Sequence, residues 1–366
     1  MFSTLLIAFA IVVVLNCLIY LFFAFYAFAK PQISHKHAEF PVSVIICSKN
    51  EAENLKNHIP LWLEQKYSNF ELILINDASI DETLDVIEAF AETDNRIKIV
   101  DVKNNEAFWA NKKYALTLGI KKAKNNYFIF SDADCKPLSN LWIQEMANHF
   151  SSEKQLVLGY GAYAKEKGIL NKLIRFETAL TALQYFSFAK AGMAYMGVGR
   201  NLAYTSRLFY DTNGFMSHMY IRSGDDDLFV NEAASRTKVA LCDSPESFTV
   251  SEPKKTWSSY IHQKKRHLTT ASHYKITHKF LLSFIFLTHV FFWISTAVSF
   301  ALLKWEWVTA LVFLRLLVQF IVFGKTFKKF RESGLILFLP LLELMLICLQ
   351  ISIFISNIFS KPKHWK

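Results

Sequence analysis

The sequence predicts an α/β domain with a mixed, mostly parallel sheet, placed between segments that are apolar enough to cross a membrane. Between residues 38 and 255, short β-branched apolar runs alternate with helical patterns, an order that favours a parallel sheet covered on both faces. Outside this region the chain is strongly apolar, and the hydrophobic fraction of the whole sequence reaches 52%. The 366 residues therefore suit one globular domain and a small membrane domain.

The first apolar segment predicts a retained membrane anchor within residues 1–30. Residues 4–29 contain no charged side chain, and about 20 apolar residues are enough to cross a bilayer core. A cleaved signal peptide is the alternative. It is disfavoured because the apolar stretch is too long for a signal sequence and no basic region precedes it.

A second apolar block, in residues 279–366, predicts two to three further transmembrane helices. It divides near 280–303, 307–324 and 335–359, where interfacial tryptophans and a basic stretch interrupt it. Pro340 and Glu343 leave three alternatives for the last segment: a kinked helix, packing inside a bundle, or re-entry from one side.

The net charge of +10 is explained by basic residues beside the apolar segments, including 263–266 and 325–331. Positive charge near membrane helices favours the cytoplasmic side, which predicts a multi-pass cell-membrane protein with a cytoplasmic domain and no nucleic-acid partner. Four complete crossings would leave the lysines of residues 361–366 outside, against the same rule. The five cysteines show no paired spacing, so neither a disulfide framework nor a zinc site is expected.

The globular domain is expected to contain four strands, the first of them a short β-branched apolar run. Helical spacing such as that of Leu84, Ile87 and Phe90 indicates the helices between them. The expected strands are 42–47, 70–75, 96–102 and 127–130, and the expected helices end near Leu63, span 84–90 and cover 112–122.

Polar clusters follow three of these strands, at 48–51, at 76–77 and at Asp132-x-Asp134. In parallel sheets the ligand crevice lies beyond the carboxyl ends of the strands, so the clusters are expected to converge. Two carboxylates one residue apart can hold Mg²⁺ or Mn²⁺ against a phosphate. Turn and helix-capping roles explain single residues but not the combination.

Phosphate binding cannot depend on a glycine-rich loop, because neither common glycine-rich nucleotide motif is present. A nucleotide phosphate would have to be neutralised by a metal and by basic side chains, for which Lys112, Arg200 and Arg266 are candidates.

A second acidic cluster, residues 225–227, precedes an apolar helical stretch. Helix capping is one explanation, since acids stabilise the first turn of a helix. Three adjacent acids repel one another and raise each other's pKa, which would improve proton abstraction from a hydroxyl at neutral pH. We therefore expect a catalytic base here.

Residues 256–278 predict an amphipathic segment at the membrane surface. By residue type alone, its basic stretch indicates an electrostatic anchor. The alternative is a lid whose Gln263 and Arg266 reach a diphosphate.

Taken in order, these motifs resemble the membrane-anchored family 2 inverting glycosyltransferases with a GT-A fold. The branch in question includes ceramide glucosyltransferase and the processive polysaccharide synthases. The resemblance covers about residues 40–270, and it lies in the segments 42–51, 76–81, the helix at Lys112, 131–134, 224–227 and Gln263-x-x-Arg266.

The resemblance implies a role for each matched residue. The expected nucleotide-sugar contacts are Glu51, Asp77, Lys112, Asp132, Gln263 and Arg266, with Asp77 on the uracil edge and Lys112 on the diphosphate. Asp132 and Asp134 would hold Mn²⁺ or Mg²⁺, and Asp226 would be the catalytic base with Asp225 beside it.

Two positions depart from the family pattern. Asn76 replaces the first acid of the usual Asp-Asp pair, which is tolerable if Asp77 makes the base contact. His267 stands where a tryptophan lines the acceptor entrance of processive synthases, which counts against polymer synthesis. Gly197 to Asn201 is either an acceptor-side loop or a plain glycine-rich turn.

The expected function is inverting, metal-dependent transfer of a sugar from a nucleotide-sugar donor, UDP-linked by resemblance, to a membrane-bound lipid acceptor on the cytoplasmic face. A processive synthase that exports a glycan is the enzymatic alternative. A metal-dependent lipid phosphotransferase and a non-catalytic membrane scaffold are further alternatives, although every key acid is retained.

Overall fold

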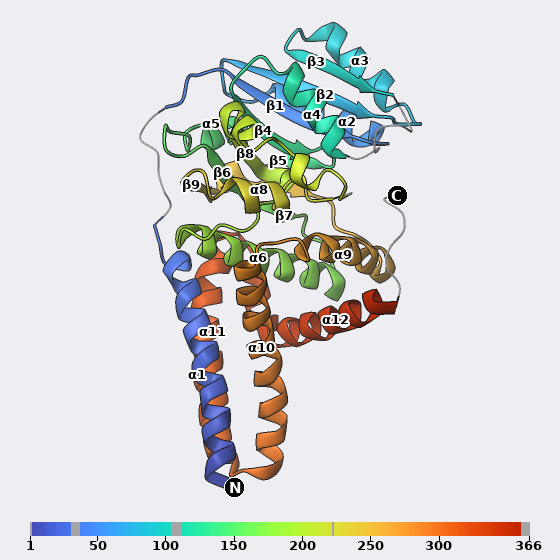
Figure 1. Cartoon of the computed structure of the whole chain (residues 1–366). Coiled ribbons are helices and arrows are strands. Elements are labelled where there is room, and N and C mark those ends of the chain that lie inside the picture. Colours follow the sequence, from blue (N-terminus) through green and yellow to red (C-terminus); the bar gives the residue numbers. More distant parts are fainter. Residues whose placement is uncertain (1, 31–36, 104–111, 222, 360–366) are drawn as a thin grey trace. The chain divides into compact units, whose positions relative to one another are not determined.

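The computed structural model describes residues 2–30, 37–103, 112–221 and 223–359. Its contacts divide the chain into two units (Figure 1). The helical unit contains Met1–Lys30, Glu166–Ser187 and Lys254–Lys363, and the sheet unit contains the segments between them. The sequence prediction treated 38–255 as one domain, whereas residues 166–187 group with the apolar helices.

The sheet unit is built on a seven-stranded mixed sheet in the order β3-β2-β1-β4-β8-β6-β9. The strands are β1 (Val42–Ser48), β2 (Phe70–Asp77), β3 (Ile97–Val102), β4 (Tyr127–Asp132), β6 (Leu156–Gly159), β8 (Leu202–Thr205) and β9 (Val239–Cys242). β1 to β4 run parallel, β8 is antiparallel to both its neighbours, and β6 pairs parallel with β9. The predicted mostly parallel sheet and its first four strands are confirmed.

A second, three-stranded sheet extends the sheet unit beyond β4. It contains β5 (Cys135–Pro137), β10 (Thr249–Ser251) and β7 (Gly161–Tyr163). β10 lies between the other two strands, antiparallel to β5 and parallel to β7. β5 begins at Cys135, directly after Asp134, so the predicted metal-binding pair lies between the end of β4 and this small sheet in the chain.

Helices connect the strands of the large sheet. Those of the sheet unit are α2 (Ala52–Leu63), α3 (Thr83–Thr93), α4 (Lys112–Lys122), α5 (Trp142–Ala147), α7 (Ser206–Asp211) and α8 (Asp227–Ala233), with 3-10 turns η1 (Gly199–Asn201), η2 (Met216–His218) and η3 (Pro245–Ser247). The central strands are mostly buried, and Val44 and Leu72 share one core cluster with Ile59 and Trp62 of α2.

Gly119 allows α4 to approach the sheet closely. A Cβ atom at this position would lie 2.4 Å from Cδ1 of Ile75 on β2. Because real side chains are excluded at that distance, glycine sets the depth at which α4 packs. Lys112 is the first residue of the same helix, so this packing also positions a predicted site residue.

The helical unit contains seven helical elements. They are α1 (Phe2–Ala27), the part of α6 (Ile169–Lys190) up to Ser187, α9 (Trp257–Ala271), α10 (Ile276–Leu302), α11 (Trp305–Lys329), the 3-10 segment η4 (Ser333–Phe338) and α12 (Leu339–Phe359). Within the described residues, four stretches are long and apolar enough to span a membrane: Thr4–Ala27, Ile276–Leu302, Trp305–Lys329 and Ser333–Asn357. The protein thus has one N-terminal and three C-terminal apolar helices, the upper number predicted.

Candidate active site

Three strand ends meet at one edge of the large sheet. β1 lies between β2 and β4, and all three strands run parallel, with Ser48 in register with Asn76 and Cys47 with Asp132. Their carboxyl ends therefore share one edge, as the sequence predicted for the three polar clusters. Lys49 continues from β1 and places its Nζ 4.0 Å from the carboxylate of Asp77.

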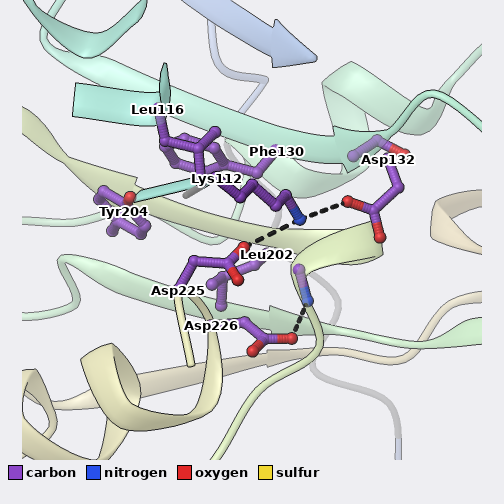
Figure 2. A pocket seen from close by; sticks show the side chains of 10 residues that line it. Lys112, Leu116, Phe130, Asp132, Leu202, Tyr204, Asp225 and Asp226 are labelled. Carbon is purple, nitrogen blue, oxygen red and sulfur yellow. Dashed lines mark hydrogen bonds and ion pairs between the residues drawn. The ribbon is translucent and has the colours of Figure 1, made fainter. Parts of the chain in front are cut away.

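Lys112 joins the two acidic clusters of the sequence. Its Nζ lies 2.7 Å from Oδ1 of Asp132 and 2.9 Å from Oδ2 of Asp225 (Figure 2). Burial opposes the charge on this ammonium, but the two carboxylates outweigh it and raise the pKa of Lys112 well above its usual value. Lys112 is therefore a permanent cation between the end of β4 and the loop before α8.

Asp226 is held by two backbone N–H groups. Gly199 N donates to its Oδ2 at 2.7 Å (Figure 2), and Asp227 N donates to its Oδ1 at 2.7 Å, which makes Asp226 the N-cap of α8. Each carboxylate oxygen keeps a further lone pair. Asp226 thus has the capping role and also lines the pocket, while its role as a catalytic base stays a prediction.

The neighbouring acids Asp225 and Asp226 differ in their pKa. Burial, then the charges of Asp225 and Asp227, raise the pKa of Asp226 from 3.8 to about 7, with Lys112 acting in the opposite direction. Burial also disfavours charge on Asp225, but the ammonium of Lys112 outweighs it and lowers the pKa. Such divergent environments are typical of acid–base sites, and Asp226 can accept a proton near neutral pH.

A pocket surrounds these groups (Figure 2). Its lining combines charged side chains with an apolar wall and comprises Lys112, Leu116, Phe130, Ser131, Asp132, Gly199, Leu202, Tyr204, Asp225 and Asp226. The apolar wall lowers the local dielectric constant, which strengthens every charge interaction inside. It also explains why burial dominates the pKa of Asp226.

The group formed by Asp132, Asp134 and Cys135 fits a hard divalent cation. Their ligand atoms lie within 4.8 Å of one another. Burial raises the pKa of the Cys135 thiol well above its usual value, so this sulfur stays protonated and is a poor ligand. The two carboxylates remain as ligands, and oxygen donors suit Mg²⁺ or Mn²⁺.

The predicted nucleoside contacts lie at the β1–β2 side of the same edge. Glu51 occupies the N-cap position of α2 without a side-chain capping bond, and its Oε2 accepts a hydrogen bond from Nδ2 of Asn54 at 2.6 Å. Asp77 is buried, and burial raises its pKa while Lys49 and Lys112 oppose the shift.

Asn76 has a structural role that explains its departure from the family pattern. Its Nδ2 donates to Oδ1 of Asp101 at 2.8 Å, and its Oδ1 accepts from Ser79 N at 3.2 Å. An aspartate at position 76 would repel Asp101 and could not donate this hydrogen bond. The asparagine therefore ties β2 to the end of β3 and closes the turn after Asp77.

The structure does not bring all predicted residues into one unit. Gln263 and Arg266 lie on α9 in the helical unit, so their assignment to the diphosphate stays a prediction. Glu51, Asp77, Lys112, Asp132, Asp134, Asp225 and Asp226 all belong to the sheet unit.

Two contributing residues were not foreseen in their present roles. Gly199 was predicted only as part of a turn or acceptor loop, whereas its N–H binds Asp226. Lys113 is fully buried, and its Nζ donates to the carbonyl oxygens of His218 at 2.6 Å and Ile221 at 3.0 Å. The separate role of Lys113 had a signal in the sequence, where lysines 112 and 113 are adjacent. Side chains of neighbouring helix residues point about 100° apart, so the two lysines are expected to meet different partners.

The chain was compared with known proteins. Residues 43–209 match the profile of "Glycosyl transferase family 2". An uncharacterized glycosyltransferase of Haemophilus influenzae is 33% identical over 136 residues, which cover 35% of this chain and 40% of that protein. The UDP-Glc:alpha-D-GlcNAc-diphosphoundecaprenol beta-1,3-glucosyltransferase of Escherichia coli is 29% identical over 34% of this chain and 47% of its own length. The alignments with the first three curated relatives span 40% to 54% of those proteins.

One solved structure is similar over almost the entire chain. It is the mannosyltransferase from Pyrobaculum calidifontis in complex with GDP-Man and Mn²⁺, with a TM-score of 0.62 and 15% sequence identity, covering 99% of this chain and 100% of that one. At this identity the likeness concerns the fold. The profile match assigns residues 43–209 to glycosyltransferase family 2, and the structural likeness shows that they form part of a GT-A domain.

Proposed function

We propose that the protein transfers a sugar from a nucleotide-sugar donor to a lipid acceptor in the membrane, with inversion at the anomeric carbon. The observation that carries this proposal is the position of Asp226, a buried carboxylate with a pKa of about 7, across Lys112 from the Asp132 and Asp134 pair. This arrangement supports a site in which Asp226 accepts a proton and Asp132, with Asp134 beside it, forms the diphosphate-binding end.

In this proposal Asp226 removes the proton from the acceptor hydroxyl. The hydroxyl oxygen forms a bond to the anomeric carbon as the bond from that carbon to the diphosphate oxygen breaks, and the nucleoside diphosphate leaves with the electron pair. A single displacement from the face opposite the leaving group inverts the configuration.

The remaining residues of the site stabilise charge on the diphosphate and orient Asp226. Lys112 lies where it can neutralise charge that develops on the diphosphate, because its ammonium is fixed between Asp132 and Asp225. A divalent cation bound by Asp132 and Asp134 would supply further positive charge to the same oxygens. Gly199 orients Asp226 through its backbone N–H.

The donor and acceptor classes are supported by the relatives. The printed name of the Escherichia coli relative specifies UDP-Glc and a diphosphoundecaprenol-linked acceptor, and the Pyrobaculum structure contains GDP-Man and Mn²⁺. We propose a UDP-sugar as donor, Mn²⁺ or Mg²⁺ as cofactor, and a lipid on the cytoplasmic face as acceptor. The acceptor class is supported by four helices long and apolar enough to span a membrane.

The test is transfer by the purified full-length protein. It is incubated with UDP- and GDP-sugars, Mn²⁺ or Mg²⁺ and host lipid extract, and the product is identified by mass spectrometry. Asp226→Asn should lower the transfer rate by about 10² to 10⁴-fold, the usual contribution of a general base, with nucleotide affinity nearly unchanged. Asp134→Ala should weaken both transfer and nucleotide binding.

The outcomes separate the alternatives. Full transfer activity in Asp226→Asn would exclude this base assignment. A ladder of long products on a gel would indicate a processive synthase instead of a single transfer. Product formation without release of a nucleoside diphosphate would indicate a phosphotransferase, and nucleotide binding without any product would support a scaffold.

A further inference from the structure

The last apolar segment, Ser333–Asn357, is long enough to cross a bilayer, yet it differs from the other three in direction. Figure 1 shows α1, α10 and α11 running along a common axis, whereas α12 runs crosswise to them within the same unit. Length and apolarity therefore fail to distinguish this helix from a spanning one.

α1, α10 and α11 share one axis direction, with α10 running opposite to the other two, and they define two ends of a bundle (Figure 1). Nζ of Lys329, at the end of α11, donates to the carbonyl oxygen of Ala29, just after α1, at 3.2 Å. At the opposite end Phe9 of α1 packs with Leu303 and Val308, at the turn from α10 to α11. α10 ends at Leu302, beside that turn, so its start at Ile276 lies at the other end of the bundle, which is the Lys329 end.

Both ends of the α12 segment are tied to α6 and α9. Before it, Glu332 forms a buried ion pair with Arg175 of α6. At its other end Nζ of Lys265, on α9, donates to Oγ of Ser356 at 2.6 Å. α6 and α9 are themselves joined, because Nζ of Lys264 lies 2.6 Å from the carboxylate of Glu177.

The chain also turns sharply where α11 stops. Arg331 has a φ of 59°, a left-handed conformation typical of a residue that ends a helix. It redirects the chain at the same end of the bundle at which Glu332 meets α6. The α12 segment therefore starts and finishes near one end of the bundle.

A buried polar group holds the first half of α12 against the bundle. Nη2 of Arg315 on α11 lies 2.5 Å from Oε1 of Glu343 on α12 and 2.8 Å from the hydroxyl of Tyr20 on α1. Both charged side chains are buried. Away from Glu343, α12 exposes apolar side chains, with Leu341 and Ile355 each at least half exposed, as expected for contact with lipid.

We propose that α12 lies along one leaflet, with α6 and α9 on its polar side and lipid on its apolar side, so that only α1, α10 and α11 cross the membrane. The partner of this surface is the lipid of the leaflet at the Lys329 end of the bundle, the end at which the chain leaves α1 and enters α10. Three crossings also avoid the conflict that four crossings create with the basic residues near the end of the sequence.

Single-cysteine labelling in sealed vesicles tests the topology without depending on sugar transfer. The background variant lacks Cys17 and Cys348. Into it, Lys255→Cys, Glu306→Cys or Asn357→Cys introduces one reporter at a time. The background without a reporter measures the labelling of the cysteines that remain. Lys255 precedes α9 and Glu306 begins α11, so they report the two opposite faces.

A membrane-impermeant maleimide should label the reporter at position 357 from the same face as that at 255. Labelling from the face of position 306 would overturn the proposal. An epitope joined after residue 366, probed with protease from either face, repeats the test with no change in α12. Its accessibility from the face of position 306 would also overturn the proposal.

Discussion

At the residue scale, the pocket concentrates carboxylates where burial makes charge costly. Asp225 keeps its charge because Lys112 lies 2.9 Å away, whereas Asp226 receives neutral backbone donors only and has a pKa of about 7. Two acids adjacent in sequence thus acquire different protonation behaviour from their different partners. This difference makes pH the most direct probe of the site.

The rate of transfer is expected to depend on the ionisation of Asp226. As pH falls below about 7, protonation removes the base, so kcat/KM should fall about tenfold per pH unit. Asp226→Asn should remove this dependence from the residual rate. Asp211→Asn, which changes an exposed acid on α7, should keep the wild-type profile. A wild-type profile that is flat from about pH 5 to 8 would contradict the assignment.

The same residue should limit the stability of the fold. Since the folded pKa of Asp226 is raised from 3.8 to about 7, its favourable contribution is complete below pH 3.8 and is lost as pH rises through 7. Asp226→Asn should therefore increase the free energy of unfolding by about 1–3 kcal/mol at pH 8, after allowance for one weakened backbone hydrogen bond. Thermal unfolding in detergent at pH 8 and pH 5 measures this, and a lower Tm at pH 8 would refute it.

Lys113 is expected to act as a positioning residue. It anchors the carbonyl groups of His218 and Ile221, in the segment that leads to Asp225. Lys113→Met should lower kcat/KM about tenfold, because two buried acceptors lose their donor, while Lys113→Arg keeps donors at this position and should retain more activity. We expect the acceptor KM to rise more than the donor KM, whereas equal changes in both would indicate a general loss of folding.

At the element scale, α4 transmits the packing of the sheet to the pocket. It carries Lys112 and Lys113 in its first turn and Gly119 in its second half, where a Cβ atom would meet Ile75. The position of the central cation therefore depends on a contact made two turns away. Because the core is close-packed, a larger side chain at position 119 would displace α4 or Ile75.

Gly119→Leu is expected to lower the free energy of unfolding by about 1–3 kcal/mol through overpacking and to weaken nucleotide-sugar binding by displacing Lys112. Lys121→Leu is the matched control, since it introduces the same side chain on the exposed side of the same helix. Urea or thermal unfolding and a nucleotide titration measure the two effects. Equal behaviour of the two variants would disprove the packing argument.

At the scale of the whole molecule, two differently built units are joined in one chain. The sheet unit is stabilised by apolar strands and their helices, while the helical unit contains a buried ion pair, Arg315 with Glu343, together with Gln319, whose Oε1 lies 2.5 Å from Nη1 of Arg315. Charged groups in apolar surroundings are stabilised only as long as both partners are present.

Arg315→Met should destabilise the protein by about 3–5 kcal/mol, because it leaves Glu343 buried without its cation. The double variant Arg315→Met with Glu343→Met should recover most of that loss, since no charge is then left unpaired. Glu306→Gln, at an exposed position of α11, serves as the control. Thermal unfolding in detergent compares the three proteins, and a double variant as unstable as the single one would contradict this account.

Much of the fold could be predicted from local patterns. The β-branched runs of β1, β2 and β4 and the uncharged segment at residues 4–29 are visible because side-chain periodicity and apolar length act over a few neighbouring residues. The convergence of Asp77 and Asp132 also followed, because parallel strands place their carboxyl ends at one edge of a sheet.

The antiparallel strand β8 and the grouping of residues 166–187 with the apolar helices were not predicted. Both are determined by contacts between segments far apart in the chain, and such contacts leave no local period in the sequence.

The sequence by itself determined which chemical groups this protein has: the acidic clusters, the lysines at the start of α4, and one N-terminal and two to three C-terminal apolar helices. Only the tertiary structure decided how they act. It showed that Lys112 links Asp132 to Asp225, that Asp226 is both helix cap and titrating carboxylate, and that α12 runs crosswise. The physical reason is that a pKa depends on burial and on neighbouring charges, while the direction of a helix depends on the residues that its two ends contact. Only folding brings these charges and contacts together.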